Sequence, residues 1–181
     1  WRVSVVHQDD PKGLGHAVGC ASGSVDGDAF VVSLPDEIMG GPEFLQKMID
    51  VCSKTSGSVV GLMEVNRSEV SAYGVVAPAA EMVDGVVKID DLVEKPSVED
   101  APSSLIIIGR YVLTVDIFDE IARLTPGAGG ELQLTDAIRA QTQCAPLHGV
   151  ETMVDRWDTG TPQGFLTAAV EIALVHGWAD G

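Results

Sequence analysis

The chain of 181 residues is 45% hydrophobic and 21% charged, a balance typical of a folded domain rather than of a disordered chain. Eleven Lys and Arg residues against 27 Asp and Glu residues give a net charge of −16. Such a surface repels nucleic acid and anionic membranes, so we expect small-molecule partners instead. A phosphate substrate would then need a metal ion, a few focused lysines or backbone N–H groups to offset its charge.

The cysteines and the hydropathy of the chain bear on the cellular compartment of the protein. Cys20, Cys52 and Cys144 are odd in number and have no CxxC spacing, which argues against a disulfide framework and against a zinc site. No apolar run approaches the ~18 residues that a membrane span requires. The sequence therefore indicates a cytoplasmic protein.

Short runs rich in Val and Ile alternate with helical patterns, which favours an α/β architecture in one domain. Pro35 is expected to end a buried strand, and Thr161 and Pro162 are a favourable N-cap and first residue for the last helix. In chain order, strands are predicted at 2–7, 29–35, 57–65, 73–78, 85–93, 104–114 and 150–160, and helices at 15–21, 42–54, 115–124, 132–143 and 162–176.

Two aspartates follow predicted strands. Asp36 comes just after the strand that Pro35 ends, and Asp158 lies between a strand and the last helix. In open α/β sheets ligands bind beyond the carboxyl ends of strands, and magnesium is usually held by one or two carboxylates together with phosphate oxygens. The pair therefore indicates one Mg²⁺ site. The alternative is a turn-forming aspartate at position 36 and a turn or Asx cap at position 158.

A second group of polar residues also lies at strand ends. A carboxylate such as Glu94 can accept two hydrogen bonds from a sugar diol, and the adjacent Lys95 can meet a phosphate, although such a pair before proline is also typical of a solvated turn. Gly74 within a strand indicates either close approach of a ligand or a bulge. His16 is expected on a helix face, and nothing in the sequence pairs Cys20 with a base, so covalent catalysis is not supported.

Several segments in order resemble one family, the bacterial UTP–glucose-1-phosphate uridylyltransferases, also called UDP-glucose pyrophosphorylases. The similarity runs from Gln8 to about His176 and includes Leu-Pro-Asp, Ala-Tyr-Gly-Val-Val and Val-Glu-Lys-Pro. The most specific stretches are APSSLIIIGRY (101–111) and GAGGELQLTDAI (127–138). The resemblance implies a Rossmann-like nucleotidyltransferase domain, of the nucleotide-diphospho-sugar transferase type, with a mixed, mostly parallel sheet.

The resemblance also implies a reaction and a site. Glucose 1-phosphate attacks the α-phosphorus of UTP in line, giving UDP-glucose and pyrophosphate without a covalent enzyme intermediate. Mg²⁺ is the implied cofactor, and the family commonly forms homo-oligomers. The implied roles are uracil contact for Gln8 and Gly13, Mg²⁺ binding for Asp36 and Asp158, glucose contact for Gly74, Glu94 and Ile107, and sugar-phosphate binding for Lys95. Lys95, Asp36 and Asp158 are thereby the implied catalytic residues.

The family pattern also contains a Gly-x-Gly-Thr-Arg loop that cradles the triphosphate and a Pro-Lys-Glu segment, and neither motif occurs in this sequence. We therefore expect residues 1–181 to be the C-terminal portion of a single sugar-nucleotidyltransferase domain that lacks its first strands. Such a chain is expected to expose sheet edge and apolar surface, to be poorly stable, and to turn over negligibly alone. The alternatives are a non-catalytic nucleotide or sugar-phosphate binding remnant, or a related transferase that uses dTTP or CTP.

Overall fold

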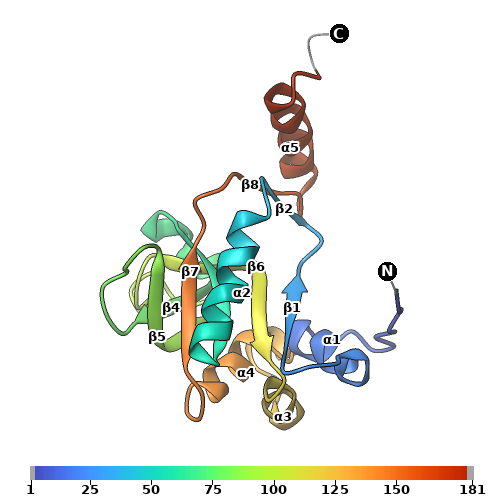
Figure 1. Ribbon diagram of the computed structural model, residues 1–181, viewed down its shortest axis with the longest axis vertical. Helices are drawn as coiled ribbons and strands as arrows, with labels where there is room; N and C mark the ends of the chain where they lie inside the picture. The colour runs from blue at the N-terminus through green and yellow to red at the C-terminus, as the bar shows by residue number, and fades with distance from the viewer. Residues whose placement is uncertain (1–2, 179–181) are drawn as a thin grey trace.

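A curved sheet separates two groups of helices in the computed structural model, which describes residues 3–178 (Figure 1). The strands are β1 (Ala29–Ser33), β2 (Glu37–Met39), β3 (Ser58–Glu64), β4 (Gly74–Pro78), β5 (Val86–Glu94), β6 (Leu105–Thr114), β7 (Leu147–Glu151) and β8 (Arg156–Asp158). The α-helices are α1 (Leu14–Cys20), α2 (Glu43–Thr55), α3 (Ile117–Arg123), α4 (Leu134–Gln141) and α5 (Pro162–Val175). This order confirms the predicted alternation of helices and strands.

The main sheet has the strand order β1-β6-β3-β7-β5-β4, and β4 also pairs with β6 at Val75 and Ile106, so the sheet curls back on itself. Among the described strands, only β3 and β7 run parallel, and the other neighbours in the main sheet are antiparallel. The expected "mostly parallel" sheet is therefore wrong, although the sheet is mixed as predicted. Strand direction depends on long-range pairing, which the local sequence pattern does not contain.

Two hydrophobic cores lie on opposite faces of the sheet. Along β6, Ile106 and Ile108 face the core beneath α2, while Ile107 and Leu113 face the core shared with α1, α3 and α4. Side chains alternate across a strand, so a continuous apolar run such as LIIIGRYVLT fills both cores at once. This double burial fixes β6 at the centre of the fold. Among residues 3–178, no helix is both long and apolar enough to cross a bilayer.

Three predicted elements differ from the structure. Residues 3–7 form no strand, and Arg2 lies outside the described residues, so the first predicted strand is wrong where it can be compared. β1 is not buried: its residues alternate between exposed and half-buried, because β1 is an edge strand that pairs with β6 alone among the described strands. The strand predicted at 150–160 is interrupted, because residues 152–155 are irregular between β7 and β8.

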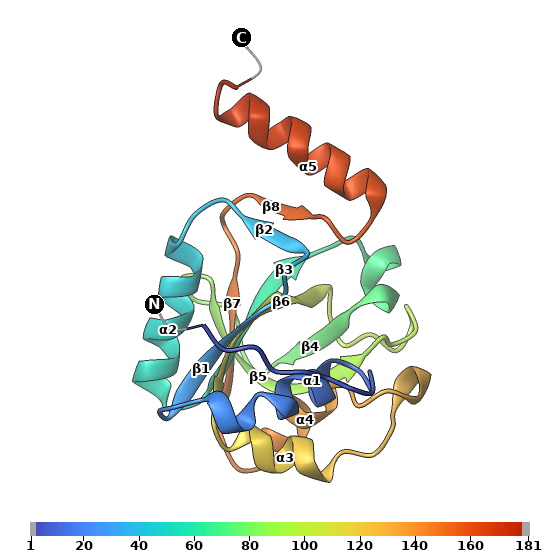
Figure 2. The same cartoon turned by 90° about the vertical axis from the view of Figure 1, so that its right-hand side faces the viewer.

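Two apolar surfaces are exposed. Val31 of the edge strand β1 is 40% exposed. Helix α5 projects from the body beyond the small β2–β8 sheet (Figure 2), and Phe165, Leu166 and Val170 on it are each 59–64% exposed. The sequence predicted an exposed sheet edge and exposed apolar surface, and both are present in the structure. Whether the chain aggregates stays a prediction, which a cooperative melt of a monomer would contradict.

Candidate functional site

The two predicted metal-binding aspartates meet at Gly160. A Cβ atom placed on Gly160 would lie 3.1 Å from Asp158 Oδ1 and 3.2 Å from Asp36 Oδ2, so both carboxylates face the same space. The loops that carry them are joined by two hydrogen bonds, because the Thr159 N–H and Oγ1–H both donate to the Asp36 carbonyl, at 2.7 and 2.8 Å. The Gly160 N–H also donates to Asp158 Oδ1 at 2.9 Å, so the Asx-type turn considered as an alternative for Asp158 is present.

The strands beside these aspartates form their own small sheet, because Asp36 directly precedes β2 and Asp158 is the last residue of β8. β2 and β8 pair antiparallel, with Glu37 opposite Asp158 and Met39 opposite Arg156. Arg156 Nη2 lies 2.6 Å from Glu37 Oε1 and 3.5 Å from Asp158 Oδ2. Burial disfavours the charged form of Arg156, but the hydrogen bond and charge of Glu37, followed by the charge of Asp158, outweigh it and raise the pKa of the guanidinium. Arg156 is therefore a permanent cation between two carboxylates.

A second buried arginine ties this loop to the main sheet. Arg110 on β6 donates through Nη1 to the carbonyls of Leu34 and Gly109, at 3.1 and 2.8 Å, and through Nη2 to the Glu37 carbonyl at 2.6 Å. The carbonyls of Leu34 and Glu37 lie on either side of Asp36 in the chain, so Arg110 fixes the backbone that presents this carboxylate. Arg110 was not predicted as a site residue from the sequence.

The predicted sugar-contact residues also come together. Gly74 on β4 pairs with Glu94 on β5, and a Cβ atom on Gly74 would lie 3.2 Å from Glu94 Oε2, 3.2 Å from Thr135 Oγ1 and 3.4 Å from Ile107 Cδ1. The missing side chain thus leaves a small space bounded by a carboxylate, a hydroxyl and an apolar group. The register irregularity of β4 lies at Ala77 and Pro78, so the bulge considered at Gly74 is absent. Thr135 was missed from the sequence because only the fold brings it to β4. We name these four residues, Gly74, Glu94, Ile107 and Thr135, the Gly74 cluster.

Lys95 has a strained backbone. Its φ of 47° lies in the left-handed region, which a side chain other than glycine adopts at a cost. Its N–H donates to the Tyr73 carbonyl at 3.0 Å, which holds this conformation, and its Nζ lies 3.7 Å from Glu94 Oε1. The side chain of Lys95 is 51% exposed and that of Glu94 only 13% exposed. The solvated-turn alternative therefore describes Lys95 but not Glu94.

The predicted base-contact residues pack against the loop before α4. Gln8 Nε2 lies 3.2 Å from the Gly13 carbonyl and 2.9 Å from His16 Nδ1, which uses its amide hydrogens and leaves its carbonyl oxygen as an acceptor. Gly13 has a φ of 101° and a Cβ there would lie 2.9 Å from the Leu132 carbonyl, so only glycine fits. His16 Nε2 lies 3.8 Å from Cys20 Sγ, which corrects the expectation that Cys20 has no base beside it.

Two observations connect these groups. Tyr111 on β6 is buried, and its pKa is raised by that burial and then by the charges of Glu37, Glu94 and Asp36, so carboxylates from both groups act on one tyrosine. The segment 131–135 contacts Gly13 at one end and Gly74 at the other. The predicted base-contact and sugar-contact residues are therefore connected through the segment 131–135.

The residues present fit a divalent cation of the magnesium type. Among residues 3–178, no group of three or more His, Cys, Asp or Glu side chains is close enough to hold a metal. Two carboxylates on one side of Gly160 are nevertheless the donor set that Mg²⁺ takes when phosphate oxygens and water complete its coordination.

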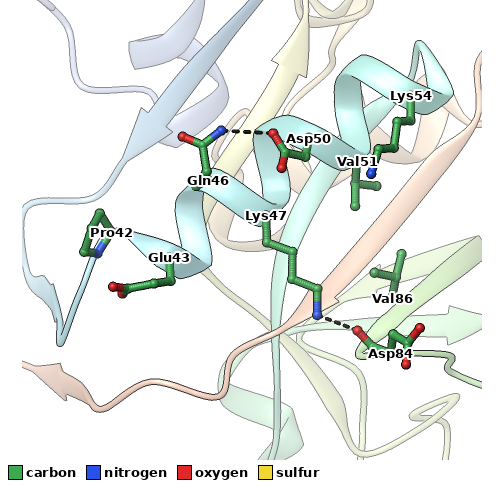
Figure 3. Close-up of a pocket in the computed structure, with 9 residues that line it drawn as sticks. All are labelled: Pro42, Glu43, Gln46, Lys47, Asp50, Val51, Lys54, Asp84 and Val86. Carbon is green, nitrogen blue, oxygen red and sulfur yellow. Dashed lines mark hydrogen bonds between the residues drawn. The ribbon is translucent and has the colours of Figure 1, made fainter.

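A groove elsewhere contains none of the predicted site residues. It lies between α2 and the turn before β5 (Figure 3). Lys47 crosses it and donates to the Asp84 carbonyl at 2.5 Å, while Gln46 donates to Asp50 at 2.9 Å within the helix. Lys47 is already hydrogen-bonded to the backbone of the turn. We therefore attribute this groove to the contact between α2 and the turn before β5.

Comparison with protein families identifies the class. Residues 1–174 match the family model described as "Nucleotidyl transferase", and the chain belongs to this family. The chain is homologous to UDP-glucose pyrophosphorylases. It is 41% identical over 176 residues to a UTP--glucose-1-phosphate uridylyltransferase of Streptococcus pyogenes, a match that covers 94% of this chain and 58% of the relative. The chain thus spans less than two thirds of the length of this relative.

Solved structures give the same result. A crystal structure of UDP-glucose pyrophosphorylase complexed with UDP-glucose superposes with a TM-score of 0.87 at 37% identity, over 93% of this chain and 65% of that one. A UTP-bound UDP-glucose pyrophosphorylase from Acinetobacter baumannii gives 0.82 at 34% identity, over 93% of this chain and 59% of that one. The predicted nucleotidyltransferase fold is therefore confirmed.

Proposed function

We propose that residues 1–181 are the C-terminal portion of a single nucleotidyltransferase domain that transfers the uridylyl group of UTP to glucose 1-phosphate. The observation that carries the proposal is the convergence of two carboxylates at Gly160, together with the Gly74 cluster at the other end of the same surface. Relatives of similar structure are described as bound to UDP-glucose and to UTP, which are the product and the substrate of this reaction. The share of the relatives' length that the chain covers supports its being a portion of the domain.

In this reaction a phosphate oxygen of glucose 1-phosphate forms a bond to the α-phosphorus of UTP. The bond from that phosphorus to the oxygen bridging the α- and β-phosphates breaks, and pyrophosphate leaves with the electron pair. The protein's task is to orient the two anions and to offset their charge, and it contributes no covalent intermediate. Mg²⁺ held by Asp36 and Asp158 would supply charge neutralisation for the phosphates.

The Gly74 cluster is proposed to bind glucose. Glu94 accepts hydrogen bonds from two neighbouring hydroxyls, Gly74 lets the ring approach the backbone of β4, and Ile107 contacts the apolar face of the sugar. Lys95, exposed and next in the chain, meets the phosphate of the sugar as a point charge.

Gln8 and Gly13 are proposed to contact the uracil. The Gln8 carbonyl oxygen remains available for the N–H of a uracil-type imide, and Gly13, whose carbonyl accepts from Gln8 Nε2, lies beside it. Thymine presents the same imide, so Gln8 alone does not favour UTP over dTTP. The relatives bound to UTP and UDP-glucose favour the uridine nucleotide.

The proposal includes a cytoplasmic location and assembly of the complete protein as a homo-oligomer. It also states that this chain alone turns over UTP and glucose 1-phosphate negligibly, because its sequence contains no Gly-x-Gly-Thr-Arg loop to hold the triphosphate. A non-catalytic binding module of the same fold is the competing function, and turnover by a complemented or complete protein would separate the two.

The first test uses the chain itself. UDP-glucose is titrated with Mg²⁺ into ¹⁵N-labelled protein, and the amides of Gly13, Gly74 and Lys95 are expected to shift. Glu94→Gln should weaken binding about tenfold, because the neutral amide accepts more weakly than a carboxylate. Glu99→Gln, an exposed change on the same segment, is the matched control and should have no effect. If UDP-glucose moves none of these amides, the proposed site is wrong.

A further inference from the structure

We propose that Arg156 and Glu37 are positioning residues that hold the carboxylates of Asp36 and Asp158 at the spacing a divalent cation requires. The inference deepens the proposed function and rests on it for the cation, whereas the positioning itself is a property of this chain. Neither residue was singled out in the sequence, because they lie 119 positions apart and meet only through the β2–β8 sheet.

Arg156 is placed to act on the metal-site aspartate directly. Its Nη2 lies 2.6 Å from Glu37 Oε1 and 3.5 Å from Asp158 Oδ2, so one nitrogen serves both carboxylates. The side chains of Arg156 and Glu37 are each 10% exposed, and that of Asp158 is 48% exposed. The buried partner therefore anchors the arginine, and the arginine in turn restrains the exposed aspartate.

The burial of this ion pair is costly. Within the described part of the chain, Glu37 Oε2 and Arg156 Nε are buried without a hydrogen-bond partner. An ion pair whose remaining polar atoms are unsatisfied contributes little net stability, because desolvation offsets its attraction. The Arg156–Glu37 pair is therefore better explained by its effect on the position of Asp158 than by a contribution to the stability of the β2–β8 sheet.

The opposite side of the site is already fixed. Arg110 binds the carbonyls on both sides of Asp36, and Thr159 donates to the Asp36 carbonyl itself. Asp158 is restrained through its carboxylate instead, by the Gly160 N–H on Oδ1 and by Arg156 on Oδ2. Removal of Arg156 should therefore release Asp158 while Asp36 stays in place.

The Gly160 amide reports this release without any metal. It donates to the side chain of Asp158, whereas the neighbouring Thr159 amide donates to the backbone of Asp36. In Arg156→Met we expect the Gly160 amide resonance to move toward its position in an unstructured chain, while the Thr159 amide and the amides of residues 37–39 stay. Glu37→Gln should move Gly160 in the same direction.

Cation binding is measured in parallel with Mn²⁺ alone, followed by electron paramagnetic resonance. Arg156→Met should weaken Mn²⁺ binding about tenfold, as loss of a group that orients a metal ligand generally does. Arg156→Lys keeps the charge and should restore most of the affinity, which a role in packing alone does not predict. Arg139→Met, which removes an exposed arginine–carboxylate pair with Asp91, is the matched control and should change neither readout.

The outcomes separate the two proposals. If the Gly160 amide stays unchanged in Arg156→Met and in Arg156→Lys, the positioning role is wrong whatever Mn²⁺ does. If Arg156→Met loses the β2–β8 sheet altogether, Arg156→Lys decides, and affinity as low as that of Asp158→Asn overturns the role. If Gly160 moves but wild type and Asp158→Asn bind Mn²⁺ equally, positioning holds and the proposed metal function fails.

Discussion

The two ends of the candidate site are built in different ways. The Gly74 cluster lies on the long strands β4, β5 and β6 and at the start of α4, where Ile107 and Thr135 are 6% and 9% exposed. Of the aspartate pair, Asp158 lies on a ladder of three residues outside the main sheet and Asp36 directly precedes that ladder, so the geometry of the pair depends on charged and polar contacts. The proposed sugar end is therefore preformed by core packing, whereas the proposed metal end is adjustable through a few side chains.

Truncating the core at the sugar end should produce the largest effect. Ile107→Ala removes a buried side chain from the core and should lower the free energy of unfolding by about 3 kcal/mol, because a cavity remains. Urea denaturation measures the loss. The Gly160 amide should keep its position, because the aspartate pair does not rest on this packing. A loss below about 1 kcal/mol would contradict preformation by the core.

Arg110 ties the loop of Asp36 to β6, so its removal should lower stability and release this loop. Arg110→Met leaves the buried carbonyls of Leu34, Gly109 and Glu37 without this donor and should cost about 2 kcal/mol. The Thr159 amide, which reports the Asp36 backbone, should shift. Arg67→Met is the matched control, because the exposed Arg67 also donates to two backbone carbonyls, those of Ala101 and Ser103, away from the site. Equal effects of the two substitutions would refute the link.

Filling the space at Gly74 should affect binding more than stability. In Gly74→Ala the new methyl group meets Glu94 and Thr135 at 3.2 Å, which requires small side-chain shifts. Affinity for UDP-glucose should fall about tenfold, which corresponds to about 1.4 kcal/mol. Isothermal titration calorimetry measures this change. Gly23→Ala, where a Cβ meets no atom within 4 Å, should bind as wild type does.

The smallest effect is expected at the surface ion pair of Arg139 and Asp91, which belongs to neither end of the candidate site. The Arg139 hydrogen bond lowers the pKa of Asp91 against the opposing effect of burial. A lowered folded pKa contributes stability that is fully present above the unfolded value, about 3.9, and is lost as pH falls through the folded value. Because both side chains are substantially exposed, the contribution is at most about 1 kcal/mol. The stability difference between wild type and Arg139→Met should therefore vanish in acid, and a difference that grows in acid would contradict it.

The sequence predicted best what depends on local pattern. The helix 162–176, with Thr161 as its N-cap, is observed as α5, where the Thr161 hydroxyl accepts from the Gly164 N–H. The continuous apolar run of β6 also predicted a central strand correctly. Strand direction was predicted wrongly, and β2 was not predicted, because a three-residue strand has too little pattern to identify.

At the site, carboxylates at strand ends indicated Asp36, Asp158 and Glu94 beside the alternative of simple turns, a glycine within a strand indicated Gly74, and the family resemblance selected all four. The structure brings these residues together in two pairs. Arg110 and Arg156 were missed as parts of the site. Their partners lie 73 and 119 positions away, and an isolated arginine in a strand pattern carries no local signal of such contacts. The candidate residues carry a chemical signal in the sequence, whereas the contacts of these two arginines are recognised only in the fold.

The projection of α5 has a mechanical consequence. The helix starts at Pro162, two residues after Gly160, and in its second half Glu171 Oε2 accepts from Trp157 Nε1 of β8 at 2.8 Å. Most of its length extends away from the body, with Leu166, Val170 and Leu174 exposed (Figure 1). Such a helix is joined to β8 at two points along its length, so β8, the strand that ends at Asp158, would carry a load applied to the exposed apolar face of α5.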